Sequence, residues 1–444
     1  MNDALDLVVT GGTLVTMDGA RRVIDGDVLV KEGAIVAIGR LPRGTRARVV
    51  DARGCAVVPG FVQAHVHLCQ ALFRGMADEL PLMRWLRERI WPLEAAHDDA
   101  SLGASARLGL LEMMRAGTTT VLDMGTVRGQ DAIFEAMRAS GIRGLSGKAM
   151  MDAGAGLPKG LRESRHDSLR ESEALHARWS RAGRLGYAFA PRFILSCSEK
   201  LLRGVAELAA GKSALVHSHA SEHRAERDEV QKRFGKADVD VLAGWGIAGP
   251  RTVLAHGVQL GRGERNRAGR AGTRFLHCPS ANLKFASGIA DVVAMREAGI
   301  VVGLGADGAP CNNRMDPFTE LRQAALLAKV ARQDAAALSP MDALAMLTID
   351  GARVLGLEAE IGSIEVGKRA DLAVVRIDGL HAEPWGEPVS RLVYSATAAD
   401  VTDVLVDGLP VVSRGELRAL DEGAVREEAR RQAALAHRRA RLRG

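Results

Sequence analysis

The sequence predicts an α/β protein, a (β/α)8 barrel of the TIM type with a small β-sandwich built from both chain ends. Two observations predict this fold. Through the middle of the chain, short apolar runs alternate with helical segments, as in parallel βα units. At both ends, apolar alternation and glycine-bearing turns indicate short strands, in residues 1–57 and again after residue 358. A length of 444 residues suffices for one barrel and a smaller second domain.

The domain organisation follows from these patterns. Because two β segments at opposite ends of a chain can pair with each other, residues 1–57 and 358–421 are predicted to form one sandwich. Residues 58–357 are predicted to form the catalytic barrel. Residues 422–444, in which alanine and leucine recur among arginines, are predicted to form a basic C-terminal helix.

Eight apolar runs are candidate barrel strands: residues 61–67, 118–125, 143–150, 185–191, 214–219, 252–256, 273–277 and 300–307. The active site of such a barrel lies at the C-terminal ends of its strands. Several of these runs end in polar residues, namely His65, His67, His217, His219, His256 and His277, with Asp307 at the end of the eighth run. A single histidine there is usually a satisfied core residue, but this number at one barrel mouth predicts a functional site.

The spacing of the first pair predicts a metal centre. Residues i and i+2 of a strand face the same side, so His65 and His67 both point into the barrel mouth. Zinc prefers imidazole nitrogen and carboxylate oxygen, and a catalytic site keeps a position for water. His219 and Asp307 are the natural remaining ligands. Such a cation lowers the pKa of water and supplies a hydroxide nucleophile.

Three residues are candidates for the chemistry itself. Glu222 lies three residues after His219 and is expected to carry a proton from water to a ring nitrogen of the substrate. His256 is expected to hydrogen-bond the water or the oxyanion, and Asp307 to orient the nucleophile as well as to ligate. Taken alone, Glu222 could equally be a solvated carboxylate at a helix start.

Composition excludes several other classes of protein. No apolar run is long enough to span a bilayer, and the first residues lack the pattern of a secretory signal. The five cysteines contain no CxxC pair, which favours reduced thiols and a cytoplasmic location. The net charge of +6 is concentrated in the C-terminal helix, which lacks aromatic stacking residues, so no nucleic-acid partner is expected.

Six motifs carry a resemblance to a known family: "PGFVQAHVH", "HASE", "LAHGVQL", "HCPSANLKFASGIA", "GLGADGAPCNN" and "IGSIEVGKRADLAVV". They resemble the amidohydrolase superfamily over about residues 5 to 415. Within it they resemble the branch of triazine hydrolases, guanine deaminase and methylthioadenosine/S-adenosylhomocysteine deaminases, including sequences described as 5′-deoxyadenosine deaminase-like. The resemblance implies one Zn2+ per chain, with Fe2+ possible, on His65, His67, His219 and Asp307. It also implies a homo-oligomer, a dimer or tetramer.

The loop after the first strand bears on the substrate. "RGMADELPLMRWLRERIWPLE" resembles deaminases of 5′-modified adenosines, where a tryptophan packs over the nucleoside and a glutamate accepts hydrogen bonds from ribose. Trp85 and Glu94 match those positions, and Lys148 matches a basic residue. For Trp85, a core aromatic is the rival interpretation. We therefore expect a zinc-dependent deaminase of a purine nucleoside such as 5′-deoxyadenosine, methylthioadenosine or S-adenosylhomocysteine, releasing ammonia.

Two residues depart from that pattern. Arg192 stands in "APRFILSCSE", which resembles guanine deaminase, and Gln70 matches a glutamine which that enzyme uses on the base. Together they could recognise the carbonyl of an oxopurine or pterin. The alternatives are therefore a guanine, oxopurine or pterin deaminase or an s-triazine hydrolase. A non-catalytic barrel that acts as a binding protein is a more remote alternative.

Overall fold

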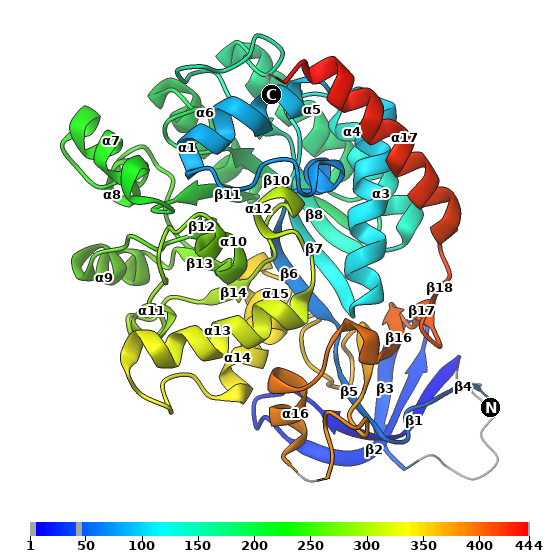
Figure 1. Cartoon of the computed structure of the whole chain (residues 1–444). Helices are drawn as coiled ribbons and strands as arrows, with labels where there is room; N and C mark the ends of the chain where they lie inside the picture. Colours follow the sequence, from blue (N-terminus) through cyan, green and yellow to red (C-terminus); the bar gives the residue numbers. More distant parts are fainter. Residues whose placement is uncertain (1–5, 41–46, 385, 443–444) are drawn as a thin grey trace.

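The structure is a computed structural model that describes residues 6–40, 47–384 and 386–442. The extreme ends of the predicted sandwich and of the predicted C-terminal helix, residues 1–5 and 443–444, lie outside the described residues. Figure 1 shows a large unit in which helices surround a group of strands, and a second sheet beside it that carries the N-terminal strands.

Eight parallel strands form the barrel. Their order is sequential around the sheet, and the last strand approaches the first through a parallel bridge between Val66 and Asp307. The strands are β6 (Phe61–Val66), β7 (Thr118–Met124), β8 (Arg143–Gly147), β10 (Leu185–Pro191), β11 (Leu215–Ala220), β12 (Thr252–His256), β13 (Arg274–His277) and β14 (Val302–Leu304), and the short β9 (Ala149–Met150) pairs with β10. The predicted fold class is confirmed, and each predicted barrel strand has its counterpart.

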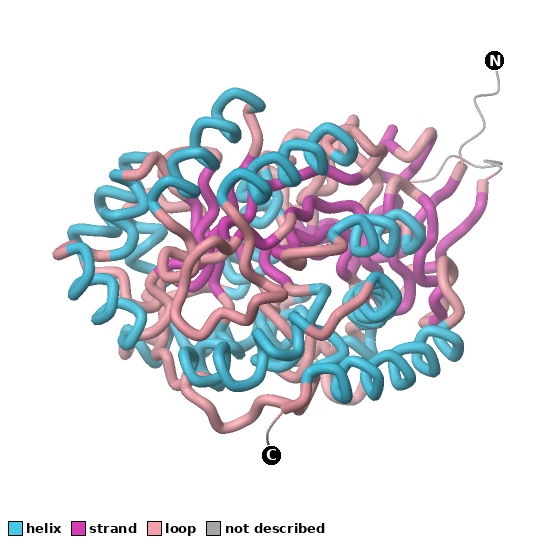
Figure 2. The backbone as a smooth tube through the Cα atoms, turned by 90° about the horizontal axis from the view of Figure 1, so that it is seen from above, coloured by secondary structure: helices cyan, strands magenta, loops and turns pink. Residues whose placement is uncertain are grey.

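Helices connect the strands and form the outer ring, which surrounds the strands when the molecule is seen from above (Figure 2). Polar caps begin several of them: Asp98 accepts a hydrogen bond from the Ser101 backbone, and Ser198 accepts one from Leu201. The helices between β7 and the chain's return to the second sheet are α4 (Gln130–Ser140), α5 (Arg165–Trp179), α6 (Glu199–Lys212), α7 (Arg224–Phe234), α8 (Asp238–Gly244), α9 (Arg262–Ala271), α10 (Pro279–Lys284), α11 (Val292–Glu297), α12 (Ala309–Asn312), α13 (Pro317–Arg332), α14 (Pro340–Leu347) and α15 (Ile349–Leu355).

Both chain ends build the second sheet. Strand β5 pairs antiparallel with β15, which joins the N-terminal strands to the C-terminal ones in a single nine-stranded sheet. Its strands are β1 (Leu7–Val15), β2 (Val23–Lys31), β3 (Ala34–Gly39), β4 (Arg48–Asp51), β5 (Cys55–Pro59), β15 (Leu372–Arg376), β16 (Val401–Val406), β17 (Leu409–Ser413) and β18 (Glu416–Leu417), with helix α16 (Pro388–Tyr394) between β15 and β16. The sheet encloses its own apolar core, which includes Leu14, Val28, Leu372 and Leu405. The domain boundaries themselves stay a prediction.

A buried ionic cluster fastens this sheet to the barrel. Arg143 begins β8, and its Nε donates to Asp371 Oδ2 at 2.8 Å. Asp407 accepts from Arg143 and from Arg184, while its backbone N–H donates to Asp371 at 2.7 Å. The Asp371 carboxylate is fully buried. Its ion pair with Arg143 is therefore required to offset the free-energy cost of removing its charge from water.

The connection after β6 covers the barrel mouth. It comprises η1 (Leu68–Phe73), α1 (Leu82–Trp85), η2 (Leu86–Ile90), α2 (Trp91–Ala95) and α3 (Asp99–Arg115). The segment Leu86–Ile90 is a π-helix, in which the Trp91 N–H reaches back five residues to the Leu86 carbonyl. Pro92, which follows, has no N–H to continue the ordinary pattern, and π turns of this kind often occur at functional sites.

The C-terminal helix α17 (Glu422–Ala440) lies along α3 (Figure 1). Near its end, Arg439 donates to the carbonyl of Ala96 at 2.7 Å and pairs with Asp98 at 2.9 Å. The helix is therefore part of the packed molecule. Among the described residues, no helix combines the length and the apolar character that crossing a membrane requires.

Candidate metal centre and active site

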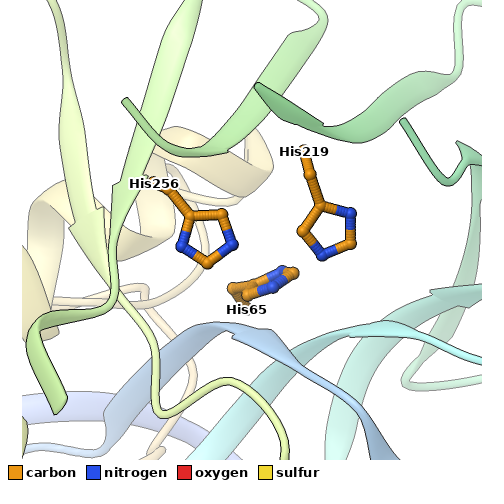
Figure 3. A group of neighbouring side chains, drawn as sticks. All are labelled: His65, His219 and His256. Atoms are coloured by element: carbon orange, nitrogen blue, oxygen red, sulfur yellow. The ribbon is translucent and has the colours of Figure 1, made fainter. Parts of the chain in front are cut away.

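Four side chains converge where the barrel strands end. His65 and His67 lie at the end of β6, His219 lies on β11, and Asp307 follows β14. Nε2 of His67 is 3.2 Å from Nε2 of His219, and Asp307 Oδ1 is 3.5 Å from His65 Nε2 and 3.4 Å from His67 Nε2. Figure 3 shows His65, His219 and His256 directed toward one another. The structure brings together the four residues that the sequence predicts as metal ligands.

The outer hydrogen bonds of two rings fix which nitrogen carries the proton. His67 Nδ1 is 2.8 Å from the carbonyl oxygen of Met124, and His219 Nδ1 is 2.7 Å from that of Arg192. A carbonyl only accepts, so each Nδ1 is protonated and each Nε2 of a neutral ring presents a lone pair. Two lone pairs thus face each other across 3.2 Å, where neutral rings cannot hydrogen-bond.

Burial keeps these rings neutral. Desolvation lowers the pKa of His65, His67 and His219 well below the ordinary value. The buried Nε2 of His65 has no hydrogen-bond partner within the described part of the chain. Three neutral imidazoles and a carboxylate therefore point at one place. Their spacing matches the ligand separation of about 3.3 Å around a tetrahedral zinc with bonds of about 2.0–2.1 Å, so the donor set fits one divalent cation.

A glycine lets the eighth strand bring Asp307 to this place. A Cβ on Gly305 would lie 2.5 Å from the backbone oxygen of His65 and 2.7 Å from its nitrogen, closer than any side chain allows. The backbone N–H of Asp307 then donates to the His65 carbonyl at 3.0 Å. Gly305 is therefore needed for the close approach that closes the barrel at the metal ligands.

Glu222 and His256 lie beside these ligands. His256 Nε2 is 3.5 Å from Glu222 Oε2 and 3.9 Å from Asp307 Oδ2. Burial raises the pKa of Glu222 well above its usual value, and the nearby carboxylates of Asp307 and Glu226 add to the shift. A carboxyl whose pKa is raised by burial suits general acid and base catalysis.

Three non-glycine residues at these strand ends have left-handed backbone conformations: Ser221 (φ 55°), His256 (φ 77°) and Asp307 (φ 62°). Each such residue costs about 1–3 kcal/mol and persists only where surrounding contacts enforce it. The strain lies at the ends of β11 and β12 and after β14, which is where the candidate site is assembled.

A small cavity is lined by three of the four candidate ligands, His67, His219 and Asp307. Its lining residues include three of the predicted substrate contacts, Gln70, Trp85 and Arg192, with Phe285 opposite the tryptophan. Trp85 and Phe285 meet edge to face with ring centroids 4.8 Å apart. Trp85 is buried and also forms part of the cavity wall, so its position fits both interpretations that the sequence left open.

Glu94 lies behind this wall rather than on it. Arg192 holds its carboxylate with two N–H groups, one of them at 3.1 Å, and Gln70 donates to it at 2.7 Å. The residue expected to receive ribose hydroxyls is therefore already engaged by the protein. Substrate hydroxyls would have to replace or share these hydrogen bonds.

Lys148 lies away from the cavity, in contrast to its predicted contact with substrate. Its side chain is fully buried, and its ammonium pairs with Glu163 and with Glu171, the latter at 2.7 Å. Because all of its charge is directed at these carboxylates, its contacts indicate a structural role. The sequence placed Lys148 correctly at the end of a strand but could not show which way the side chain turns.

Two orienting residues were not assigned by sequence reasoning. His217 Nε2 is 2.8 Å from His65 Nδ1, and Asn282 Oδ1 is 3.0 Å from His256 Nδ1. Such outer hydrogen bonds fix the tautomer and direction of a functional imidazole. The i, i+2 spacing of His217 and His219 was a usable signal for the first. Asn282 lies in the quoted motif "HCPSANLKFASGIA", but nothing in the sequence assigned it a role.

The fold and this constellation define a metal-dependent hydrolase of the barrel type. A family model confirms the class: the chain belongs to the amidohydrolase family, whose model matches residues 56–411. Families of this kind act through metal ions held at the barrel mouth.

Several similar proteins are deaminases. The chain is 38% identical to a 5′-deoxyadenosine deaminase of Methanothermobacter thermautotrophicus over 97% of this chain and 99% of that one. It is 39% identical to a 5-methylthioadenosine/S-adenosylhomocysteine deaminase of Halobacterium salinarum over 98% of each. Among solved structures it is similar to a zinc-bound adenosine deaminase from Xanthomonas campestris (TM-score 0.92, 32% identity, 98% and 99% covered) and to the E. coli guanine deaminase (0.84, 28%, 92% and 99%).

Proposed function

We propose that this protein is a zinc-dependent deaminase that hydrolyses the exocyclic amine of a 5′-modified adenosine and releases ammonia. The candidate substrates are 5′-deoxyadenosine, methylthioadenosine and S-adenosylhomocysteine. One observation carries the proposal: neutral imidazole lone pairs and a carboxylate converge beside a protonatable Glu222 in a cavity lined by aromatic and polar groups. The names of the relatives supply the substrate class.

His65, His67, His219 and Asp307 would hold one zinc per chain, and ferrous iron would suit the same nitrogen and oxygen donors. Zinc, when bound there, supplies the Lewis acidity that makes water a nucleophile near neutral pH. The protein's own contribution is the tautomer control described above. The backbone carbonyls of Met124 and Arg192 accept hydrogen bonds from Nδ1 of His67 and of His219. Nε2 of each ring is therefore unprotonated and available to a metal.

Glu222 would move the proton that the reaction requires. Hydrolysis consumes one water and releases one ammonia, so a proton must leave the water and reach the substrate nitrogen. The carboxyl of Glu222 lines the cavity 3.5 Å from His256 Nε2, and its raised pKa suits a group that both accepts and donates a proton. Asn282 holds Nδ1 of His256, which lines the cavity, so His256 Nε2 would be available to the reacting group.

A second candidate function rests on the polar wall of the cavity. Arg192 lines the cavity as a donor, and Gln70 Oε1 is buried without a hydrogen-bond partner among the described residues. A donor beside a free acceptor complements the amide edge of an oxopurine or pterin. Guanine-type deamination, or hydrolysis of an s-triazine, is therefore the alternative to a nucleoside substrate.

A substrate panel separates these candidates. Ammonia release is measured with methylthioadenosine, 5′-deoxyadenosine, S-adenosylhomocysteine, guanine, 8-oxoguanine and ammeline. Turnover of the nucleosides with little activity on free bases supports the first proposal, and the reverse result supports the second. A zinc-loaded chain that releases ammonia from none of them would favour a binding protein.

Glu222→Gln tests the catalytic assignment. We expect kcat to fall by about 10²–10⁴-fold, which is the usual contribution of a positioned acid or base. Zinc content should stay near one per chain, because Glu222 is not one of the four proposed ligands, His65, His67, His219 and Asp307. Unchanged turnover in a fully zinc-loaded variant would remove Glu222 from the mechanism.

Three further expectations accompany this function. The protein should form a homo-oligomer, a dimer or tetramer, which light scattering of the purified chain would measure. It should act in the cytoplasm on a small molecule, and it should not bind nucleic acid. Much of the net positive charge lies in residues 422–444, where Arg439 is engaged by the carbonyl of Ala96.

A further inference from the structure

The turn that carries Glu222 is held by two buried carboxyl groups outside the cavity. Glu222 follows Ser221, a non-glycine residue with φ 55° at the end of β11. An L side chain disfavours this conformation, so something must hold it. The connection to β12 supplies both contacts through α7 and α8, which project together from the barrel in Figure 1.

Asp238 fixes Ser221 at two points. It begins α8, and its two oxygens accept the Ser221 backbone N–H and, at 2.6 Å, the Ser221 hydroxyl. The side chain is fully buried and does not line the cavity. Two bonds from one carboxyl group to the amide and hydroxyl of one residue restrict its backbone rotation. Asp238 therefore offsets the cost of the left-handed conformation.

Glu226 fixes the next residue. It lies in the first turn of α7, and its Oε2 accepts the backbone N–H of Glu222 at 3.0 Å. Only 1% of Glu226 is exposed, and its second oxygen has no hydrogen-bond partner within the described residues. Burial raises the pKa of Glu226 to about 8.

Burying two carboxyl groups is costly, and helix packing alone does not require them. Both are directed at consecutive residues of one strained turn, Ser221 and Glu222. We propose that Glu226 and Asp238 are positioning residues that lock this turn and thereby aim the Glu222 carboxyl at His256 and the cavity. This inference rests on the proposed function, because it concerns how the proposed acid and base is held.

The lock should act on turnover rather than on binding. Gln70, Trp85 and Arg192, which line other parts of the cavity, come from other elements, and Gln70 and Arg192 hydrogen-bond to Glu94. Small misplacements of a catalytic group can reduce the rate about 10²-fold. Loss of the lock should therefore lower kcat while KM, zinc content and most of the thermal stability are retained.

Three variants test the Asp238 contact. We expect Asp238→Ala to lower kcat at least tenfold with KM changed less than threefold. The double variant Asp238→Ala with Ser221→Gly should recover part of kcat, because glycine adopts the left-handed conformation without a lock. Asp240→Ala is the matched control, since Asp240 lies on the same helix but pairs with Arg267 at the surface.

Two variants test Glu226. Glu226→Gln should keep kcat within about threefold of wild type, because the amide oxygen can still accept the Glu222 N–H. Glu226→Ala should lower kcat at least tenfold. Glu229→Ala is the control, because Glu229 lies on α7 and pairs with Arg233 away from the site. Each variant is assayed as the full zinc-loaded chain on the best substrate of the panel.

The outcomes separate this inference from the proposed function. A wild-type chain without deaminase activity would overturn both. An active wild type whose Asp238→Ala and Glu226→Ala variants keep kcat would overturn the lock alone. Equal losses in Glu226→Gln and Glu226→Ala, or no recovery with Ser221→Gly, would also count against it, because both results indicate general destabilisation.

Discussion

Replacing Arg192 by methionine tests the buried ion pair behind the cavity. Arg192 and Glu94 are almost fully buried, and the guanidinium supplies two of the three hydrogen bonds to that carboxylate. In Arg192→Met only the bond from Gln70 at 2.7 Å remains. Breaking a buried pair costs about 3–5 kcal/mol, because it leaves an uncompensated charge.

A double-mutant cycle measures this cost. The free energy of unfolding is determined by urea denaturation for zinc-loaded wild type, Arg192→Met, Glu94→Gln and the double variant. The double variant carries no buried charge at this place, so it should be less destabilised than the sum of the single changes by at least about 2 kcal/mol. The Arg192 backbone carbonyl still holds His219, so zinc content should not change.

Additivity within about 0.5 kcal/mol would refute the reasoning, because it would mean that the two side chains do not interact energetically.

The same variants inform the substrate question. A nucleoside whose hydroxyls bind Glu94 should show a raised KM in Glu94→Gln. A free base recognised by Arg192 should instead lose affinity mainly in Arg192→Met.

Three other predictions follow from the structure. Lys148→Met should reduce the free energy of unfolding by about 3 kcal/mol, because it leaves the buried Glu163 without its ion-pair partner. KM should stay unchanged. A raised KM at unchanged stability would contradict this prediction. Burial raises the pKa of Asp123 to about 7, so the native state keeps a proton that the unfolded chain loses above about pH 4. Between pH 5 and 6.5, the free energy of unfolding of the wild type should therefore fall, relative to Asp123→Asn, by up to about 1.4 kcal/mol per pH unit. If the free energies of unfolding of the two proteins change with pH in parallel, the raised pKa of Asp123 is excluded. Removing zinc with a chelator should lower the melting temperature, and added zinc should restore it; binding at about 1,000 times Kd is worth about 4 kcal/mol.

The fold was predictable because the hydrophobic pattern has strong local signals. Each barrel strand was an apolar run bounded by turn residues or helical segments, and the run at 61–67 became β6 almost unchanged. The eighth run, 300–307, is shorter in the structure, since β14 covers only Val302–Leu304. After β14 the backbone turns at Asp307, which has a positive φ. No propensity scale would assign this conformation to an aspartate within a predicted strand.

The candidate ligands were also readable from sequence. The alternation of a strand places His65 and His67 on one side, and parallel strands direct their C-terminal ends to one mouth. Imidazole nitrogen and carboxylate oxygen donors then limit which metal ions the site can bind. These conclusions depend on residue type and period, both of which are local properties of the chain.

Only the tertiary structure decided the partners of the buried polar groups. Lys148 turned to Glu163 instead of the cavity, Glu94 was engaged by Arg192, and Asp238 reached Ser221 from a different helix. Such pairings join residues that are distant in sequence and depend on side-chain directions fixed by packing. A buried charge takes the nearest available partner, and no pattern along a single chain records which partner that will be.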